Sequence, residues 1–281
     1  MATRSRPEAA PADTVRPVAT FADDLRLAHV LADSVERYTL EMFHSVDLEV
    51  SVKDDGSLVT QADRHTEELL RHQLGRTRTR DVVQGEELPT TGHGNRRWVL
   101  DPIDGTTNYI RGVPVWATLI ALVVDDEPVL GLVSAPALSR RWWAALGSGA
   151  WTGRTLSSAR EIQVSDTSVL EHASLSHAAL DKWWDHPQHA GFLALAERCW
   201  RTRGYGDFWT HVLVAEGAVD IGVDPSLAVH DMAALAPIVS EAGGRFTDLD
   251  GIDGPFGLSA VSTNGLLHED TLQTLRMVGE G

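Results

Sequence analysis

One stretch of the sequence, residues 98–108, constrains the fold most strongly, because an apolar run there ends abruptly in charged and hydroxyl-bearing residues. The run Trp-Val-Leu predicts a buried strand, and Asp-Pro-Ile-Asp-Gly-Thr-Thr-Asn follows from Asp101 to Asn108. Two carboxylates this close raise each other's pKa unless a cation lies between them. Hard divalent cations prefer oxygen ligands, so Mg²⁺ is the leading candidate. For Asp-x-x-Asp alone, a simple Asp-rich turn is the alternative, but the full string is far more specific.

The residues around the two aspartates favour a second binding function. Pro102 stiffens the connection between Asp101 and Asp104. Gly105 allows a sharp turn, so the backbone amides of Gly105 and Thr106 can face an anion. The stretch therefore predicts metal and phosphate sites side by side.

The charge and cysteine content of the chain limit the kinds of partner and the cellular compartment that we expect. The chain has 281 residues, with 40 acidic against 24 basic side chains and a net charge of −16. This charge argues against nucleic acid or an anionic membrane as the main partner, and an acidic protein needs metal ions to bind a phosphate ester. A single cysteine, Cys199, excludes an internal disulfide and is typical of a reducing compartment. Without a membrane-length apolar run or a signal peptide, we expect a cytoplasmic protein.

A polar, turn-rich stretch at 152–168 predicts a boundary between two halves, 21–155 and 156–281, and residues 1–20, rich in Ala, Pro and Arg, predict a disordered tail. The first half should hold two amphipathic helices, 21–44 and 62–74, over an antiparallel-leaning sheet. The second half should alternate strands and helices, which favours an α/β layer. Its expected elements are strands near 173–175, 201–205 and 219–223 and helices near 189–200, 208–215 and 231–242.

Three local features lead to specific expectations. Thr60 and Asp63 form the pattern of a capping box for the second helix. Pro237 inside the last predicted helix implies either a late start or a kink. The loop 89–95 has turn chemistry, so we expect a mobile flap over the site.

Several motifs of the chain, taken together and in order, resemble those of one known protein superfamily. Asp101 to Asn108 resembles the signature of the inositol-monophosphatase superfamily, a group of Mg²⁺-dependent phosphomonoesterases. The segments Gly-Glu-Glu at 85–87, His-Asp-Met-Ala-Ala at 230–234 and Glu-Ala-Gly-Gly at 241–244 resemble its other motifs in the expected order. The resemblance covers roughly residues 21–278. It implies an α/β fold, a layered α-β-α-β-α sandwich of the inositol-monophosphatase and fructose-1,6-bisphosphatase type.

Two further segments, 111–117 and 204–208, resemble the histidinol-phosphatase branch of that superfamily. The resemblance implies hydrolysis of histidinol phosphate in histidine biosynthesis, by a metal-activated water near Glu86 and Thr106 and without a covalent intermediate. Inositol 1-phosphate or another small phosphate ester is the alternative substrate. A non-catalytic binding protein is a third possibility, but such a protein would be expected to have lost Glu86 or Thr106.

The resemblance also assigns roles to individual residues. Lys53 is implied to supply positive charge near the metal cluster, and Asp63 a hydrogen bond behind it. The implied ligands of two or three Mg²⁺ ions are Glu86, Asp101, the Ile103 carbonyl, Asp104 and Asp231. The implied catalytic residues are Glu86, Asp104 and Thr106. The implied substrate-binding residues are Gly105, Thr106, Asp207 and Asp224.

Three points stay open at this stage. Asp207 is either a helix N-cap or a carboxylate that recognises the cationic end of the substrate. His230 stands where the family usually has Trp, which questions the packing behind Asp231 but not the ligand itself. The number of metal ions is open, and we expect a homodimer.

Overall fold

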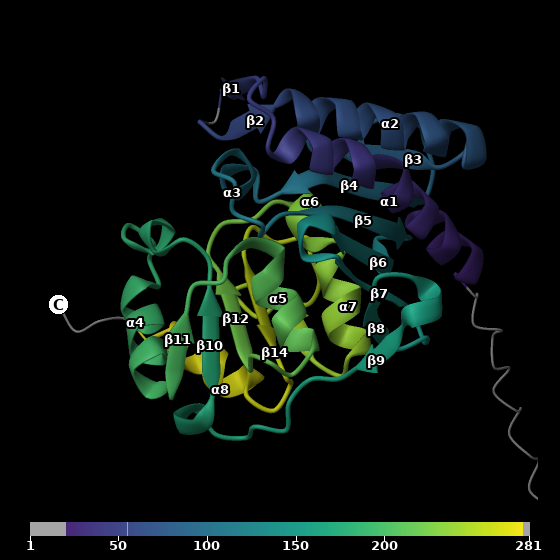
Figure 1. Cartoon of the computed structure of the whole chain (residues 1–281). Coiled ribbons are helices and arrows are strands. Elements are labelled where there is room, and N and C mark those ends of the chain that lie inside the picture. The colour runs from purple at the N-terminus through teal and green to yellow at the C-terminus, as the bar shows by residue number, and fades with distance from the viewer. Residues whose placement is uncertain (1–20, 55, 278–281) are drawn as a thin grey trace, which may run out of the picture.

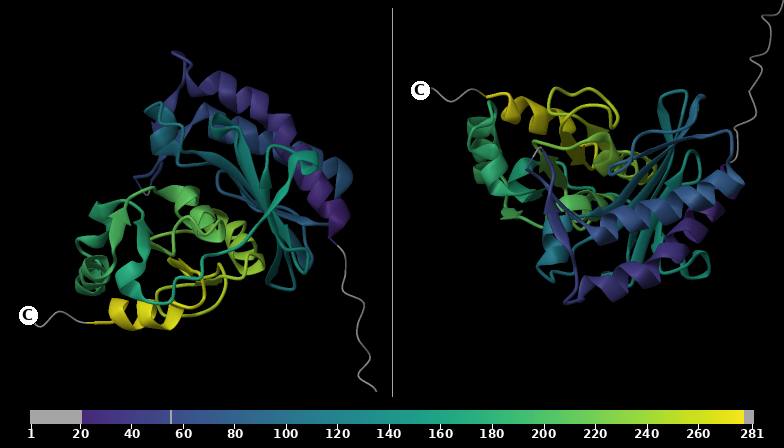
Figure 2. Two further views of the ribbon diagram at one scale, coloured as in Figure 1. Left: turned by 60° about the horizontal axis from the view of Figure 1, so that its bottom comes forward. Right: turned by 90° about the horizontal axis from the view of Figure 1, so that it is seen from above.

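The computed structural model describes residues 21–54 and 56–277, so the tail predicted at 1–20 lies outside the described residues. Figures 1 and 2 show two sheets with helices on both outer faces and between them. The order of layers is two N-terminal helices, a seven-stranded sheet, three helices within residues 207–241, a five-stranded sheet, and two helices within residues 189–198 and 268–275. The predicted α-β-α-β-α sandwich is therefore confirmed.

The helices that build these layers match the predicted ones closely where apolar periodicity was strong. They are α1 (Ala22–Phe43), α2 (Gln61–Thr77), α3 (Thr106–Ile110), α4 (His189–Arg198), α5 (Asp207–Ala215), α6 (Val229–Met232), α7 (Leu235–Glu241) and α8 (His268–Leu275). The capping box of α2 is present, since Thr60 Oγ1 accepts from the amide of Ala62 at 3.0 Å and Asp63 Oδ2 accepts from the Thr60 amide at 2.8 Å. Such a cap stabilises a helix by about 1 kcal/mol.

The seven-stranded sheet has the order β3-β4-β5-β6-β7-β8-β9, and only β3 and β4 run parallel. Its strands are β3 (Val82–Gly85), β4 (Arg96–Asp104), β5 (Ala117–Val124), β6 (Glu127–Ala135), β7 (Arg140–Ala145), β8 (Ala150–Gly153) and β9 (Arg160–Ile162). A separate hairpin, β1 (Val50–Val52) with β2 (Leu58–Thr60), precedes α2. Because β9 pairs with β8, this sheet continues beyond the boundary predicted at residue 155.

A β-bulge in β4 shapes the signature stretch. Asp101 pairs with Leu119 and Asp104 with Ala117, so two residues of β4 lie opposite one of β5. Side chains three apart in a regular strand point to opposite faces, and one extra residue brings them to the same side. Pro102 fits within this irregular segment because it has no amide to donate to the ladder. The bulge therefore lets both aspartates face one site.

The five-stranded sheet is mixed, with the order β11-β10-β12-β14-β13. Its strands are β10 (Ser174–His177), β11 (Arg201–Arg203), β12 (Ile221–Asp224), β13 (Arg245–Thr247) and β14 (Ala260–Thr263). The helix predicted at 231–242 is two helices, α6 and α7, separated at residues 233–234. Pro237 lies in the first turn of α7, where a missing amide hydrogen costs no helical bond, so the late start is the correct alternative.

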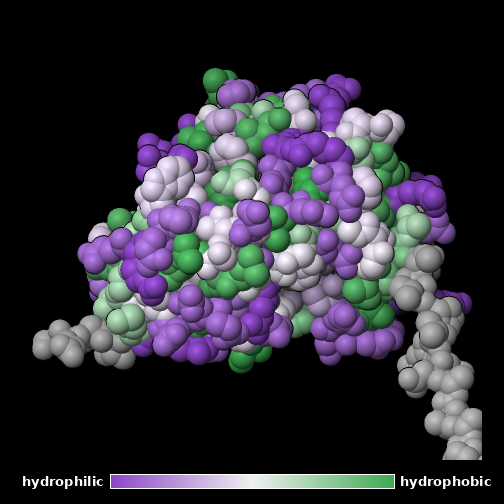
Figure 3. Space-filling model, turned by 90° about the horizontal axis from the view of Figure 1, so that it is seen from below, coloured by the Kyte–Doolittle hydropathy of each residue, from purple (hydrophilic) through white to green (hydrophobic). Residues whose placement is uncertain are grey.

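Apolar side chains fill the spaces between the layers. One cluster joins the inner faces of both sheets through α5, α6 and α7, and includes Val99, Phe208 and Ile238. Cys199 is buried in the cluster beneath α4 and α8, which agrees with a packing role. The face in Figure 3 mixes hydrophilic residues with smaller groups of hydrophobic ones. No helix in the described part of the chain is long and apolar enough to cross a membrane.

Candidate active site

Three aspartates from both halves of the sequence meet where β4 ends. Asp101 and Asp104 come from the bulged end of β4, and Asp231 comes from the short helix α6. One carboxylate oxygen of each lies within 4.8 Å of the other two. Asp101 and Asp104 are only 1% and 7% exposed, and Asp101 Oδ1 has no hydrogen-bond partner among the described residues. A buried carboxylate oxygen without a donor is costly unless a cation binds it.

The electrostatics of this triad agree with a need for a cation. Burial raises the pKa of Asp101 well above its usual range, and the charge of Glu86 adds to the effect. Burial also raises the pKa of Asp104, with further contributions from Asp207 and Asp231. The pKa of Asp231 is raised by burial as well. A hard divalent cation would relieve both the desolvation and the mutual repulsion, so an oxygen-only triad fits Mg²⁺ well.

Glu86, the fourth predicted carboxylate ligand, lies outside the triad. Lys53 Nζ donates to Glu86 Oε1 at 2.7 Å and to Glu87 Oε1 at 2.6 Å, so the lysine joins both acids. Burial alone would lower the pKa of Lys53, but its bonds to the two glutamates outweigh burial and raise it. Burial raises the pKa of Glu87 to about 7. Lys53 thus provides the positive charge expected beside the cluster.

The turn after β4 has the geometry expected of an anion site. Gly105 has φ 82° and is the N-cap of α3, whose first residue is Thr106. A Cβ at Gly105 would lie 2.8 Å from the Val115 carbonyl oxygen and 3.2 Å from Asp207 Oδ2, so no other residue fits without rearrangement. The amides at this helix start have no intrahelical acceptor and are available to an anion.

Thr106 connects this turn to residues behind the metal cluster. Its hydroxyl lies 3.2 Å from Asp63 Oδ1 and 3.0 Å from the Ile103 carbonyl oxygen, both as acceptors. Asp63 is fully buried, and its other oxygen accepts from the backbone and side chain of Thr60. Asp63 therefore caps α2 and also holds Thr106, so both interpretations of this residue apply.

Asp207 is not the cap of α5, so that alternative is wrong. The N-cap is Gly206, and Asp207 is the first helical residue, with a left-handed φ of 49°. Its Oδ2 accepts from Asn108 Nδ2 at 2.7 Å, which directs the side chain toward the signature turn. The next amide, from Phe208, donates to Asp104 Oδ2 at 2.8 Å. A strained backbone at such a position is typical of functional sites.

Asp224 lies at the end of β12 and is 3% exposed, whereas Asp207 is half-buried. Asp224 accepts a hydrogen bond from the Ser226 amide at 3.1 Å. Burial, with a smaller contribution from the charge of Asp231, raises the pKa of Asp224 to about 7 and that of Asp207 to about 6. Two carboxylates beside the aspartate triad could pair with a cationic group. We call Asp207 and Asp224 the acidic wall.

The sequence motifs gave no role to Asn108 or to Lys182. Asn108 positions Asp207, and the ammonium of Lys182 opposes burial by lowering the pKa of Asp207, Asp224 and Asp231. Asn108 ends the signature string, which was a signal for a role in the site. Lys182 lies in no motif, and only the scarcity of lysine in the chain could have drawn attention to it.

His230, which stands in place of the family's usual Trp, leaves the metal triad intact. Its Nε2 lies 3.7 Å from Asp231 Oδ1, and its charge, when protonated, lowers the pKa of that carboxyl. Asp231 Oδ2 accepts from the Ala228 amide at 2.6 Å, which fixes the side chain independently of His230. The substitution therefore does not displace the predicted ligand.

The loop 89–95 is not a flap over the site. Thr91 exchanges two backbone hydrogen bonds of 2.9 Å with Val83, and Arg71 donates to the Leu88 carbonyl oxygen. This pairing makes the loop run back along β3, away from the aspartates. Turn-forming residues alone did not reveal these long-range bonds.

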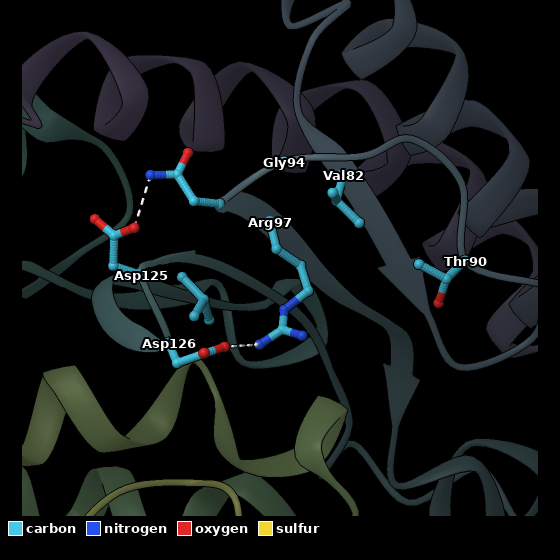
Figure 4. A pocket seen from close by; sticks show the side chains of 8 residues that line it. Val82, Thr90, Gly94, Arg97, Asp125 and Asp126 are labelled. Carbon is cyan, nitrogen blue, oxygen red and sulfur yellow. Dashed lines mark hydrogen bonds and ion pairs between the residues drawn. The ribbon is translucent and has the colours of Figure 1, made fainter.

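A cavity of about 390 Å³ lies where this loop meets the start of β4, at the other end of that strand from the aspartates (Figure 4). Arg97 pairs with Asp126 at 3.2 Å, and Asn95 donates to Asp125 at 2.7 Å. None of the predicted site residues lines the cavity. The chemistry of the triad, rather than the size of a cavity, therefore identifies the active site.

The fold and the carboxylate site together define a metal-dependent phosphoesterase class, and comparison with known proteins identifies the family. The model of the Inositol monophosphatase family matches residues 21–280, so the chain belongs to the inositol monophosphatase family. A histidinol-phosphatase of Streptomyces coelicolor is 54% identical over 256 residues, which is 90% of this chain and 96% of that protein. A histidinol-phosphatase of Mycobacterium tuberculosis is 50% identical over 254 residues, 90% of this chain and 98% of that protein.

Solved structures agree with this assignment. An inositol monophosphatase from Zymomonas mobilis superposes with a TM-score of 0.81 at 31% sequence identity. The match covers 92% of this chain and all of that one. The chain is thus similar in fold to inositol monophosphatases and more similar in sequence to histidinol-phosphatases.

Proposed function

We propose that this protein is a Mg²⁺-dependent phosphomonoesterase that hydrolyses L-histidinol phosphate to L-histidinol and inorganic phosphate. The observation that carries the proposal is the acidic wall, one buried and one half-buried carboxylate beside the aspartate triad and the turn at Gly105. Histidinol phosphate has an anionic phosphate at one end and a cationic amino group at the other, so its charges complement the two parts of the site. The high identity to two histidinol-phosphatases supports the same substrate.

The triad is proposed to hold the metal ions. Asp101, Asp104 and Asp231, together with Glu86 and the carbonyl of Ile103, would bind two or three Mg²⁺ ions. Bound Mg²⁺ supplies charge neutralisation and activation of water for phosphoryl transfer. Lys53 donates to Oε1 of Glu86, so Oε2 of the same carboxylate could bind the cation while that bond is kept.

The residues of the turn are proposed to bind and orient the reactants. The amides of Gly105 and Thr106 hold the phosphate oxygens. Because the Thr106 hydroxyl donates its proton to Asp63 or Ile103, its oxygen is free to accept a hydrogen bond from the attacking water. Thr106 and Glu86 would therefore orient that water, while Asp104 is the carboxylate that links the metal triad to α5.

The acidic wall is proposed to select the organic group of the ester. An ionised carboxylate forms a charge-assisted hydrogen bond to an ammonium group, which is stronger than its bond to a hydroxyl. Asp207 and Asp224 would therefore favour histidinol phosphate over inositol 1-phosphate. Inositol 1-phosphate is the second candidate substrate, because the solved structure at 31% identity is an inositol monophosphatase. Cytoplasmic location and a homodimer remain predictions.

Phosphate release from purified protein tests the proposal. The assay compares L-histidinol phosphate with inositol 1-phosphate at equal concentration, with Mg²⁺ and with excess EDTA. We expect hydrolysis of histidinol phosphate at least tenfold faster in kcat/KM, and no hydrolysis in EDTA. Faster turnover of inositol 1-phosphate would instead support the second candidate, and full activity in EDTA would exclude the metal mechanism.

A further inference from the structure

Glu67, on helix α2, is a fully buried carboxylate that belongs to none of the sequence motifs. Three N–H groups donate to it: Arg71 Nε to Oε1 at 2.7 Å, the Glu87 amide to Oε2 at 2.7 Å and the Leu88 amide to Oε1 at 3.2 Å. A glutamate is almost never fully buried unless it is paired and hydrogen-bonded, and Glu67 meets both conditions. Two of its donors are the backbone amides that directly follow Glu86, a proposed metal ligand.

The same carboxylate explains the glycine that precedes Glu86. A Cβ at Gly85 would lie 2.0 Å from Glu67 Oε1 and 2.5 Å from Oε2, far inside van der Waals contact. The φ of Gly85 is not in the left-handed region, so glycine is needed here for the close approach and not for its conformational freedom. Glu67 therefore contacts the chain on both sides of Glu86.

Arg71, one helical turn after Glu67, fixes this carboxylate and extends its hold on the following loop. Its Nη2 donates to the Leu88 carbonyl oxygen at 2.9 Å, and its Nη1 donates to Thr91 Oγ1 at 3.3 Å. The side chain of Arg71 is only 13% exposed, so water screens its pair with Glu67 little. The ion pair thus joins α2 to residues 85–91 through several bonds at once.

Helix α2 also contacts the other residue that is proposed to orient the attacking water. The helix lies against β3 and β4 (Figure 1), and Asp63 lies one turn before Glu67 on its buried face. Asp63 accepts from the Thr106 hydroxyl at 3.2 Å, while Glu67 holds the backbone beside Glu86. A single rigid helix therefore supports both Glu86 and Thr106 and fixes their separation.

We propose that Glu67 is a positioning residue for the metal site, which fixes the backbone on both sides of Glu86 so that this carboxylate is held in place to bind the cation. The inference rests on the proposed function in that it takes Glu86 to be a metal ligand. Glu67 touches neither the cation nor the substrate and acts only through Glu86. Lys53 has a separate task, because it contacts the carboxylate of Glu86 and not its backbone.

Glu67→Gln tests the proposal, because it keeps the size of the side chain but leaves one acceptor oxygen for three converging donors. Isothermal titration calorimetry with MgCl₂, on protein treated with EDTA and then dialysed, measures metal affinity without any substrate. We expect the Mg²⁺ affinity to fall by about 10- to 100-fold, the usual cost of losing a group that orients a metal ligand. In the phosphate-release assay, the Mg²⁺ concentration that gives half-maximal kcat should rise by the same factor.

Glu67→Asp separates the position of the carboxylate from its charge. This variant keeps the negative charge beside Arg71, but its carboxylate is one methylene too short to reach the amides of residues 87 and 88. We expect it to weaken Mg²⁺ binding in the same range of about 10- to 100-fold. It decides the question alone if Glu67→Gln does not fold by circular dichroism.

The control, Glu216→Gln, makes the same change in a second buried carboxylate. Glu216 is the C-cap of α5, at the opposite end of that helix from Asp207. Its side chain is 8% exposed, and it accepts from Trp142 Nε1 at 2.7 Å. Urea unfolding should show a loss of stability in Glu216→Gln as in Glu67→Gln, while the Mg²⁺ affinity of Glu216→Gln stays within about twofold of wild type.

Weaker Mg²⁺ binding in the Glu67 variants, but not in Glu216→Gln, supports the proposal. A Mg²⁺ affinity within about twofold of wild type in either Glu67 variant, or an equal loss in the control, overturns it.

The calorimetry also separates this inference from the proposed function. If wild-type protein binds Mg²⁺ but does not hydrolyse histidinol phosphate, the proposed substrate is wrong and the role of Glu67 is still tested by Mg²⁺ affinity. If wild-type protein binds no Mg²⁺, the proposed metal site and the role of Glu67 are both wrong. If wild type and the Glu67 variants bind Mg²⁺ equally well, only the role of Glu67 is wrong.

Discussion

Replacing Asp224 with asparagine should stabilise the fold at neutral and alkaline pH while impairing substrate selection. Burial raises the pKa of Asp224 to about 7 in the folded state, against an ordinary value of 3.8. Well below that ordinary value the carboxyl is protonated in both the folded and the unfolded state, so its pKa difference contributes nothing there. As the pH rises, the unfolded chain ionises first, and the free energy of unfolding falls until the folded carboxyl ionises near pH 7.

The size of this effect follows from the two pKa values. A difference of about three pH units corresponds to roughly 4 kcal/mol at pH 8, since each unit is worth about 1.4 kcal/mol. Wild type and Asp224→Asn are compared under identical conditions at each pH. Any pH-independent cost of the amide side chain therefore cancels when the two pH values are compared.

Urea unfolding of wild type and Asp224→Asn, at pH 4.5 and pH 8 in excess EDTA, measures the effect. The advantage of Asp224→Asn should grow by about 3–4 kcal/mol between the two pH values. Asp181→Asn, at an exposed aspartate on the 3₁₀ helix η4 (Leu180–Trp183), is the matched control and should show little change at either pH. An equal difference between Asp224→Asn and wild type at both pH values would refute the account of a buried, destabilising carboxylate.

Three further predictions concern the metal and the turn. Asp104→Asn should reduce kcat for phosphate release by several orders of magnitude while circular dichroism shows a retained fold, because one repulsive carboxylate is removed. Mg²⁺ should raise the Tm of wild type over its value in EDTA, and this increase should shrink in Asp104→Asn; an identical increase would place the ion elsewhere. Thr106→Ala should lower kcat by roughly 10²–10⁴-fold with a smaller change in KM, and a wild-type kcat would restrict Thr106 to stabilising the turn.

Much of the local structure could be predicted because its causes are local. The capping box at Thr60 and Asp63, the apolar stripe of α1 and the hairpin between β5 and β6 all depend on residues close in sequence. The signature string at residues 101–108 likewise predicted that the two aspartates of β4 lie at the site. Interactions of this kind are visible in a short window of residues.

The parts that could not be predicted depend on contacts between distant segments. Strand β9 is three residues long and exists because it pairs with β8, and the elements after residue 244 had no assigned pattern. The loop 89–95 is fixed by its pairing with β3 rather than by its own turn residues. Lys182 donates to the Ser226 carbonyl oxygen from a turn in which the neighbouring Trp183 stacks on Phe192.

The comparison of Asp207→Asn with wild type tests the central claim most directly, namely that the acidic wall selects a cationic phosphate ester. A charge-assisted hydrogen bond contributes about 1.5–3 kcal/mol, so kcat/KM for histidinol phosphate should fall by about 10- to 150-fold. For inositol 1-phosphate, kcat/KM should stay within a few fold of wild type, because its hydroxyls gain less from the charge. An equal loss for both esters would mean that Asp207 supports the turn through Asn108 and does not recognise the substrate, contradicting the claim.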